Sequence, residues 1–536
     1  MATHDEGNDA NTEKRLRIAC SCPPISGHMN HLVSLSEALA ARKNNEVFLL
    51  TFPYAIKKIE SRCEAVGIKT VGLYVGEGFD SEEALLDWKK PKLFFPSLAD
   101  HFETSYKETL DSINPDIIVC DFACLASQNY AISQNIPLVI NVAGPIDMAW
   151  DICNPVINVH NNRFTFAAGG LFVSYAGFEL TKLLLWLNVV DLGRYCDGVR
   201  RAITCGNSMV LVHSFWGLEK AQYLLHPNII PIGPIEKVPS KAPDFSQSHL
   251  ELHSFLHTAR ASQRKILLVT TGSMVLLEKW MVQLFWEAFE KLSDDKMSIV
   301  WSLKKDRQAF LSKEQLQHHA FHFSTWLPQP ALLASDLVDG VLTHCGWNGT
   351  VECISGGKPV VALPFFADQI NNTKLLLNAG CATKVAAIPM FNIDLTGQSA
   401  YVPPTNTDLG WLDLRERLRR FTKCKLTVEG LVEGCQKIMK DPRYMQKAKK
   451  LQALSSGPGK GREFACDLIE HAGHHGLRHL SESGDGDNNL PRPATIARRL
   501  SGHRPLLVTL VMLALLGWAL TKIYPLLLGL VAGSDF

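Results

Sequence analysis

Short apolar runs of strand length alternate with helical stretches along most of this chain, and this alternation restricts the fold more than any other feature. The first unit comprises a strand over 17–22, a loop over 23–30, a helix over 31–42 and a strand over 46–52. A strand, a helix and another strand in succession favour a parallel sheet that is covered by helices on both faces. The pattern therefore predicts an α/β fold.

The alternation occurs in two series, and a polar stretch with several prolines separates them. The further strands of the first series are expected over 116–120, 138–142 and 209–213. Those of the second series are expected over 265–271, 298–303, 340–344 and 359–365. Two such series predict two similar lobes, and the length of 536 residues suits two domains plus a tail.

The expected organisation of the chain follows from these series and from changes in composition. It is a disordered N-terminus over 1–14, an N-terminal domain over 15–235, a linker over 236–247, a C-terminal domain over 248–475, a solvated tether over 476–504 and a transmembrane anchor over 505–531.

The anchor is predicted from a C-terminal segment that is almost free of charge. Residues 505–521 carry no charged side chain, and the apolar character resumes after Lys522. A helix needs ~20 residues to cross ~30 Å of hydrocarbon, and a lysine near one end can reach the headgroups. Arginines precede the segment, so the catalytic domains are expected to face the cytosol at the endoplasmic reticulum membrane. A buried helix of a soluble protein is the alternative interpretation.

The charge balance argues against a role in nucleic-acid binding. The chain has 54 Lys and Arg against 53 Asp and Glu, a net charge of +1, so no overall field attracts a polyanion. The 14 cysteines have no CxxC spacing. Their distribution argues against a disulfide framework or a zinc ribbon and predicts reduced residues that pack in the core.

The segment 326–369 is the most informative about function. Its centre is the expected strand over 340–344, which leads through a glycine-containing turn into a helix that begins near Thr350. A helix N-terminus in this position presents backbone N–H groups and the positive end of a dipole, so it can bind phosphate. Asp368 and Gln369 follow the next strand, at the sheet edge where ligands of open α/β sheets bind.

This segment resembles the 44-residue donor box of plant-type UDP-dependent glycosyltransferases. It begins with Trp326-Leu-Pro-Gln329, contains His344-Cys-Gly-Trp-Asn348 and Glu352, and ends with Asp368-Gln369, all at the offsets of that family. The resemblance implies a GT-B fold, with two facing Rossmann-like domains, the nucleotide sugar on the C-terminal domain and the acceptor mainly on the N-terminal one. It also implies a UDP-sugar as co-substrate. Since no DxD-type pair lies in a convincing loop, we expect no metal.

The resemblance also implies a set of donor-binding residues. They are Ser273, Trp326, Gln329, His344, Trp347, Asn348, Gly349, Thr350, Glu352, Asp368 and Gln369. Trp326 would stack on the uracil with Gln329 beside it, and Glu352 would accept hydrogen bonds from the ribose hydroxyls. His344, Ser273, Asn348 and the backbone near Gly349 would hold the diphosphate, and Asp368 with Gln369 the sugar.

Two positions of the box depart from the family pattern. Gly349 replaces the usual serine, so a hydroxyl contact to phosphate is lost unless Thr350 supplies it. Ser335 replaces the usual earlier histidine. Neither change removes the backbone groups that would hold phosphate.

The base for transfer is expected at His28, which follows Gly27 and resembles the histidine of the family's Gly-His pair. Its nearness to a helix N-terminus is expected to keep the imidazole neutral. Asp121 follows an expected strand and resembles the aspartate that orients that histidine. His31 stands where the family usually has proline, and it is the alternative base because i and i+3 share a helix face.

The acceptor is expected to be small and lipophilic, because residues 164–190 are unusually apolar and aromatic. The same stretch could instead be core. Together these features favour an inverting transfer of a hexose to a hydroxyl group, with Gln369 favouring glucose. Two alternatives use the same fold: a sugar-nucleotide epimerase, or a membrane-tethered sugar-nucleotide binder without turnover.

Overall fold

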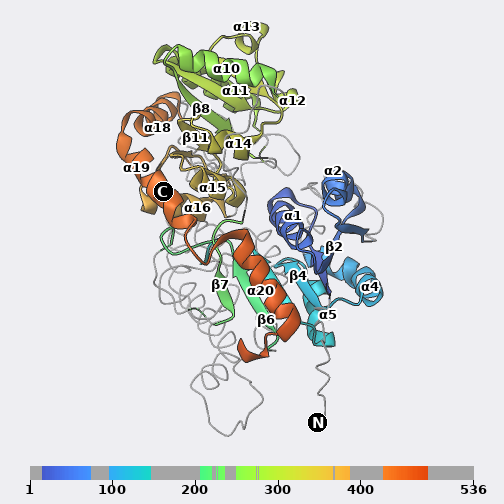
Figure 1. Ribbon diagram of the computed structural model, residues 1–536. Coiled ribbons are helices and arrows are strands. Elements are labelled where there is room, and N and C mark those ends of the chain that lie inside the picture. Colours follow the sequence, from blue (N-terminus) through green and yellow to red (C-terminus); the bar gives the residue numbers. More distant parts are fainter. Residues whose placement is uncertain are drawn as a thin grey trace, which may run out of the picture.

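Two parallel β-sheets, each covered by helices, make up the two lobes of the protein (Figure 1). The computed structural model describes residues 15–73, 96–146, 206–219, 225, 227–235, 249–272, 275, 277–365, 368–386 and 426–480. The predicted linker and the apolar stretch over 164–190 lie outside these residues.

The N-terminal sheet has seven strands in the order β3-β2-β1-β4-β5-β6-β7, and every paired neighbour is parallel. The strands are β1 (Leu16–Ser21), β2 (Asn45–Thr51), β3 (Lys69–Gly72), β4 (Ile117–Asp121), β5 (Leu138–Val142), β6 (Ser208–Val212) and β7 (Ile229–Pro231). The helices that connect them are α1 (Ser26–Ala40), α2 (Pro53–Glu64), α4 (Pro96–Ile113) and α5 (Leu125–Gln134). The strand order reverses beside β1, so β1 and β4 are neighbours, and the loops after them open in the crevice where ligands bind.

The C-terminal sheet has six parallel strands in the order β10-β9-β8-β11-β12-β13. They are β8 (Lys265–Thr270), β9 (Met297–Ser302), β10 (Phe321–Ser324), β11 (Gly340–Thr343), β12 (Val360–Ala362) and β13 (Ala382–Lys384). The helices of this part are α10 (Leu250–Ala261), α11 (Lys279–Asp294), α12 (Lys305–Gln308), α13 (Lys313–Leu316), α14 (Gln329–Ala334), α15 (Trp347–Ser355) and α16 (Gln369–Ala379). The strands predicted from the sequence begin within two residues of these strands.

The last described segment is helical and returns to the N-terminal lobe. It contains α18 (Val428–Lys440), α19 (Pro442–Ser455), α20 (Gly461–His475) and the short 3-10 helix η4 (Arg478–Leu480). α18 packs on α11 of the C-terminal lobe, whereas α20 packs on α1, β1 and β4 (Figure 1). The sequence assigned residues 461–475 to the C-terminal domain, but their buried side chains belong to the core of the N-terminal sheet.

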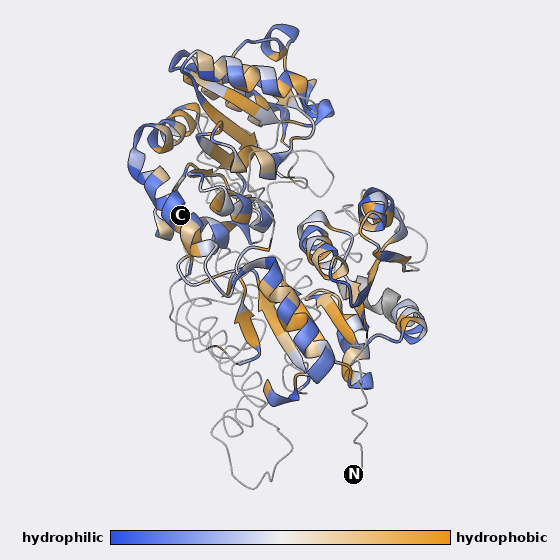
Figure 2. Cartoon of the chain, in the orientation of Figure 1, coloured by the Kyte–Doolittle hydropathy of each residue, from blue (hydrophilic) through white to orange (hydrophobic). Residues whose placement is uncertain are grey.

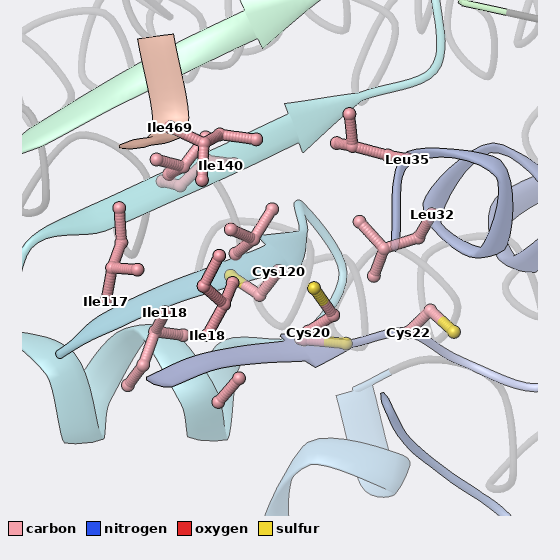
Figure 3. Packing of buried hydrophobic residues seen from close by; sticks show 14 of the residues in the cluster. Ile18, Cys20, Cys22, Leu32, Leu35, Ile117, Ile118, Cys120, Ile140 and Ile469 are labelled. Atoms are coloured by element: carbon pink, nitrogen blue, oxygen red, sulfur yellow. The ribbon is translucent and has the colours of Figure 1, made fainter. Parts of the chain in front are cut away.

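The layers assemble because apolar strands are covered by amphipathic helices. Figure 2 shows apolar strands in both sheets and a mixture of apolar and polar residues along α20. In the N-terminal core, Ile18 and Ile117 of neighbouring strands lie in one cluster with Leu35 of α1 and Ile469 of α20 (Figure 3). Burial of a large aliphatic side chain contributes about 1.5–3 kcal/mol. The described cysteines are buried and free of disulfides, as expected of packing residues.

A charged cluster beside this core also holds α20 to the N-terminal lobe. Arg42, just after α1, lies 2.8 Å from Asp467 and 3.1 Å from Glu463, and it also pairs with Glu470. Asn45 donates a hydrogen bond of 2.7 Å to the other carboxylate oxygen of Glu470. One arginine therefore joins three acidic side chains of α20 to the first βαβ unit.

We expect Arg42→Ala to lower the free energy of unfolding in urea by about 1–2 kcal/mol, because exposed ion pairs contribute about 0.2–1 kcal/mol each. The difference should shrink in high salt, which screens such pairs. Arg443→Ala is the matched control, since Arg443 pairs with Asp441 two residues away and joins no separate elements. Equal effects of the two substitutions would contradict this role of Arg42.

The predicted transmembrane helix is not part of the fold that the structure describes. Within the part of the chain that the structure describes, no helix combines the length and the apolar character that crossing a bilayer requires. The segment over 505–531 on which the prediction rested lies outside the described residues. The described part of the chain folds as two parallel α/β lobes, and the expected cytosolic orientation stays a prediction.

Candidate active site

The two residues expected to be catalytic lie together at the carboxyl edge of the N-terminal sheet. Asp121 is the last residue of β4, and His28 lies in the first turn of α1, which follows the neighbouring strand β1. The sequence placed His28 in a loop, but α1 begins five residues earlier than expected, at Ser26. Because β1 and β4 are parallel neighbours, the segments that follow them meet at one edge.

The geometry of this pair is that of an oriented imidazole. Nδ1 of His28 lies 3.0 Å from each carboxylate oxygen of Asp121, and the backbone N–H of Ala123 donates to Oδ1 at 2.9 Å. The Asp121 side chain is fully buried, whereas that of His28 is 21% exposed. A carboxylate only accepts hydrogen bonds, so Nδ1 carries the proton and Nε2 of the neutral ring is an acceptor.

The pKa of His28 is raised above its usual value of 6.5 by opposing effects. Burial lowers the pKa, but the charge of Asp121 and its hydrogen bond raise it more, and Asp368 adds to the increase. The sequence predicted that the helix N-terminus would keep His28 neutral. The structure shows that the adjacent carboxylate outweighs this influence, because it lies in direct contact with the ring.

His31, the alternative base, lies in a different environment. It is almost completely buried, and its Nε2 hydrogen-bonds Oδ1 of Asn348, which belongs to α15 of the other lobe. Burial lowers the pKa of His31 to about 4, with the Asn348 hydrogen bond opposing this change. His28 and His31 are separated by one helical turn, and it is Nδ1 of His28 that hydrogen-bonds the Asp121 carboxylate.

The donor box forms the carboxyl edge of the C-terminal sheet. β11 ends at Thr343, and the chain then turns through Cys345, which has a positive φ of 62°, into α15. Gly346 is the N-cap of this helix and has no side chain to cover its end. The first backbone N–H groups of α15 therefore point toward the space in front of the sheet edge, as phosphate binding requires.

The His344 ring packs closely against two glycines in front of this helix. A Cβ atom at Gly346 would lie 2.5 Å from Nε2 of the His344 ring, and a Cβ atom at Gly272 would also lie 2.5 Å from it. Gly272 follows β8, the neighbour of β11, and has a φ of +74°. Burial lowers the pKa of His344 to about 4, so the ring is neutral near pH 7. The two glycines explain why a ring fits here.

Gly346→Ala is expected to destabilise the protein by about 1–3 kcal/mol, because the added methyl group overpacks the His344 ring. Thermal unfolding measures this change. The double variant Gly346→Ala/His344→Ala, which removes the ring, should recover most of the loss. Gly457→Ala is the control, since its Cβ would meet no atom closer than 3.7 Å. A Gly346→Ala variant with wild-type stability would show that the ring has room to move.

The residues expected at the base and ribose lie together. The amide of Gln329, at the start of α14, donates to the Glu352 carboxylate in α15. Trp326 is 66% exposed, the only large aromatic side chain among the exposed large hydrophobics of the described residues. Its ring lies 5.8 Å from that of His249. The exposed indole lies three residues before Gln329, whose amide holds the Glu352 carboxylate, and an indole and a carboxylate suit a flat base and a diol.

Asp368 and Gln369 are organised by hydrogen bonds to neighbouring backbone and side chains. Asn372 donates to Asp368 at 2.6 Å and to the carbonyl of Cys345 at 2.9 Å, and the N–H of Phe365 donates to Gln369 at 2.8 Å. Burial raises the pKa of Asp368, although the hydrogen bond from Asn372 opposes this. Asn372 was not among the residues expected at the site, although its position one helical turn after Asp368 was an available signal.

Several expected donor residues are not placed at the surface of the site. Thr350 is fully buried, so its hydroxyl cannot replace the missing serine contact without a change in packing. Trp347 is also buried. A Cβ atom added at Gly349 would lie 3.5 Å from Oγ1 of Thr343. Ser273 lies outside the described residues. Ser335, the second departure from the pattern, is buried and donates to the carbonyl of Leu332.

Within the described ranges, no group of three or more His, Cys, Asp or Glu side chains is placed to hold a metal ion. The charges of Asp121 and Asp368 both raise the pKa of His28, which lies in the first turn of α1. The arrangement provides an oriented imidazole on one lobe and a helix N-terminus on the other.

Comparisons with known proteins agree on one group. Residues 197–400 match the family described as UDP-glucoronosyl and UDP-glucosyl transferase. The chain is 34% identical over 128 residues to nuatigenin 3-beta-glucosyltransferase of Solanum aculeatissimum, covering 23% of this chain and 26% of that protein. It is 25% identical over 393 residues to UDP-glycosyltransferase 73E1 of Stevia rebaudiana, covering 66% and 78%. The match thus spans about a quarter of the Solanum protein.

The solved structures extend this agreement to the fold. A UDP-glucosyltransferase from Polygonum tinctorium, solved in complex with 3,4-dichloroaniline, superposes with a TM-score of 0.61 at 16% identity, over 86% of this chain and 99% of that one. Similarity at this level of identity speaks for the fold alone. It confirms the GT-B arrangement of two parallel α/β lobes that the donor box implied.

Proposed function

We propose that this chain, whose residues 197–400 match the UDP-glucoronosyl and UDP-glucosyl transferase family, transfers a hexose from a UDP-sugar to a hydroxyl group of a small lipophilic acceptor, with inversion at the anomeric carbon. The observation that carries this proposal is the pair of His28 and Asp121 at the sheet edge that faces the donor helix α15. A base on one lobe and a phosphate-binding helix N-terminus on the other suit displacement of UDP.

His28 is the general base in this proposal. Its Nδ1 is engaged by Asp121, so Nε2 would accept the proton of the acceptor hydroxyl while the oxygen attacks the anomeric carbon. The imidazolium that forms is stabilised by the carboxylate, whose hydrogen bond also fixes the tautomer. The carboxylate also raises the pKa of His28. The imidazole is therefore neutral, and able to act as a base, only at a pH above this raised pKa.

The donor side of the proposal relies on the N-terminus of α15. Charge develops on the UDP leaving group during transfer, and helix N–H groups stabilise such charge without being ionised. His344 is neutral near pH 7, so it would contribute as a hydrogen-bond donor and not as a cation. Trp326 and Glu352 would bind the uracil and the ribose.

Glucose and a small organic acceptor are the finer part of the proposal. The Solanum relative is named as a glucosyltransferase, and the Polygonum protein as one capable of glucosylating indoxyl. The lipophilic character of the acceptor comes from the apolar stretch over 164–190, which lies outside the described residues. Gln369, which is held by the backbone of Phe365, is the side chain expected to favour glucose.

The proposal is tested with the purified full chain, UDP-glucose and a panel of hydroxylated compounds that ranges from terpenoids and phenols to free sugars. We expect release of UDP that depends on a lipophilic acceptor, and a product whose anomeric proton shows the β-configuration by NMR. UDP-galactose and UDP-glucuronate serve as competing donors. Activity limited to very polar sugars would overturn the acceptor class, and calorimetry without UDP binding would overturn the proposal as a whole.

A further inference from the structure

His31 bridges the two lobes, although it lies on the helix that carries the base. Its Nε2 contacts Oδ1 of Asn348, which is 317 residues away in the sequence, in the first turn of α15. The amide nitrogen of Asn348 faces the carbonyl oxygen of Ser26 at 3.5 Å. Asn348 therefore contacts α1 on both sides of His28, two residues before it and three residues after it.

The chemistry of these contacts fixes the direction of the hydrogen bonds. The carbonyl oxygen of Ser26 only accepts, so the NH2 group of Asn348 faces Ser26, and Oδ1 faces His31. Oδ1 also only accepts, and His31 must therefore donate from Nε2. A neutral imidazole has one N–H, and in His31 that N–H is used for Asn348. His31 thus has no role as a proton acceptor at Nε2.

A second histidine supports this orientation of His31. The ring of His213, which follows β6, meets the ring of His31 edge-on with centroids 4.8 Å apart. Nε2 of His213 lies 2.6 Å from Oδ1 of Asn141, so it too donates. Both rings are buried, and burial lowers the pKa of each. Packing and hydrogen bonds together leave His31 little freedom to turn away from Asn348.

We infer that His31 is a positioning residue, which fastens the first turn of α1 to Asn348 and so sets the distance between His28 and the donor helix. This inference rests on the proposed function, because the distance matters only if the base acts on a donor held by α15. A misplacement of about 1 Å between reacting groups can lower the rate about 10²-fold. The NH2 group of Asn348, oriented by His31, would also direct an N–H toward the donor.

The test compares steady-state kinetics of His31→Ala, His31→Gln and the exposed control His257→Ala. We expect His31→Ala to lower kcat about 10- to 100-fold with a smaller change in KM for UDP-glucose. The amide of glutamine can donate to Asn348, so His31→Gln should recover part of the loss. His257→Ala should match the wild type. Equal kcat values for His31→Ala and the wild type would overturn the inference.

A double-mutant cycle separates positioning from general loss of structure. If His31 acts through Asn348, the double variant His31→Ala/Asn348→Ala should lose no more kcat than Asn348→Ala alone. If the kcat losses of the two single variants multiply in the double variant, His31 acts independently of Asn348, and the inference is overturned.

Binding of UDP to the wild type is measured first, by calorimetry. Absence of UDP binding would refute the proposed function, whereas binding and turnover with an unaffected His31→Ala would refute only the role of His31.

Discussion

Replacing His28 by alanine is expected to lower kcat about 10²–10⁴-fold, the range that a positioned general base contributes. KM for the UDP-sugar should change little, because the donor is proposed to bind on the other lobe. The acceptor hydroxyl would have to lose its proton to water in this variant. Single-turnover measurement of UDP release in the presence of acceptor is the direct readout, because it reports the transfer step itself.

Two controls distinguish loss of the base from other effects of the substitution. His257→Ala, at an exposed histidine of α10, controls for the loss of an imidazole as such. UDP binding by calorimetry shows whether the His28→Ala protein is folded and competent for the donor. If His28→Ala kept near-wild-type turnover while His31→Ala lost it, the base would be His31, and the assignment of both histidines would be wrong.

Replacing Asp121 by asparagine is expected to have an effect of similar size, about 10³–10⁴-fold in kcat, as for the aspartate of a hydrolase triad. The reason is the tautomer. An asparagine NH2 group can donate to Nδ1 of His28, and the ring would then carry its proton on Nε2, where a base must accept. The geometry of the pair is kept, so the donor affinity should stay close to that of the wild type.

The pH dependence gives a second readout for the same substitution. In the wild type, kcat/KM should rise as pH increases through the pKa of His28, which Asp121 holds above 6.5, because only the neutral ring is a base. Without the carboxylate, burial remains and lowers the pKa. The acidic limb of the residual activity should therefore move to lower pH in Asp121→Asn.

Asp121→Glu keeps the charge and serves as the matched control. Its acidic limb should stay above pH 6.5 even if the longer side chain lowers kcat, since the carboxylate still raises the pKa of His28. An Asp121→Asn variant with unchanged kcat and an unchanged pH profile would be incompatible with the His28–Asp121 pair as the catalytic unit.

The strands and the donor box were predictable because their signals are local. Apolar runs such as 138–142 fit the observed strand β5 without adjustment, since a strand that is buried on both faces reads as an uninterrupted apolar segment. The box from Trp326 to Gln369 was recognised from residue types at fixed offsets within one segment. The adjacency of His28 and Asp121 was also predictable, because parallel strands bring their carboxyl ends to one edge.

The predictions that differ from the structure also came from local signals. The start of α1 was placed five residues too late, because the polar and glycine-containing residues after β1 resemble a loop. The expectation of a transmembrane helix came from hydropathy alone, and no helix of the described residues meets the length and apolarity of a span. The hydroxyl expected at Thr350 proved to be buried, since exposure along α15 depends on what packs against the helix.

By itself, the sequence determined the class of fold, the carboxyl ends of the strands that carry His28 and Asp121, and the residue types of the donor box. Periodicity and spacing act within short segments, so these features can be read locally. Only the tertiary structure decided that Asn348 lies against His31 and that α20 joins the N-terminal core. These contacts join parts of the chain that are far apart or hidden by packing. Their formation depends on how two lobes and their helices pack, which no local pattern encodes.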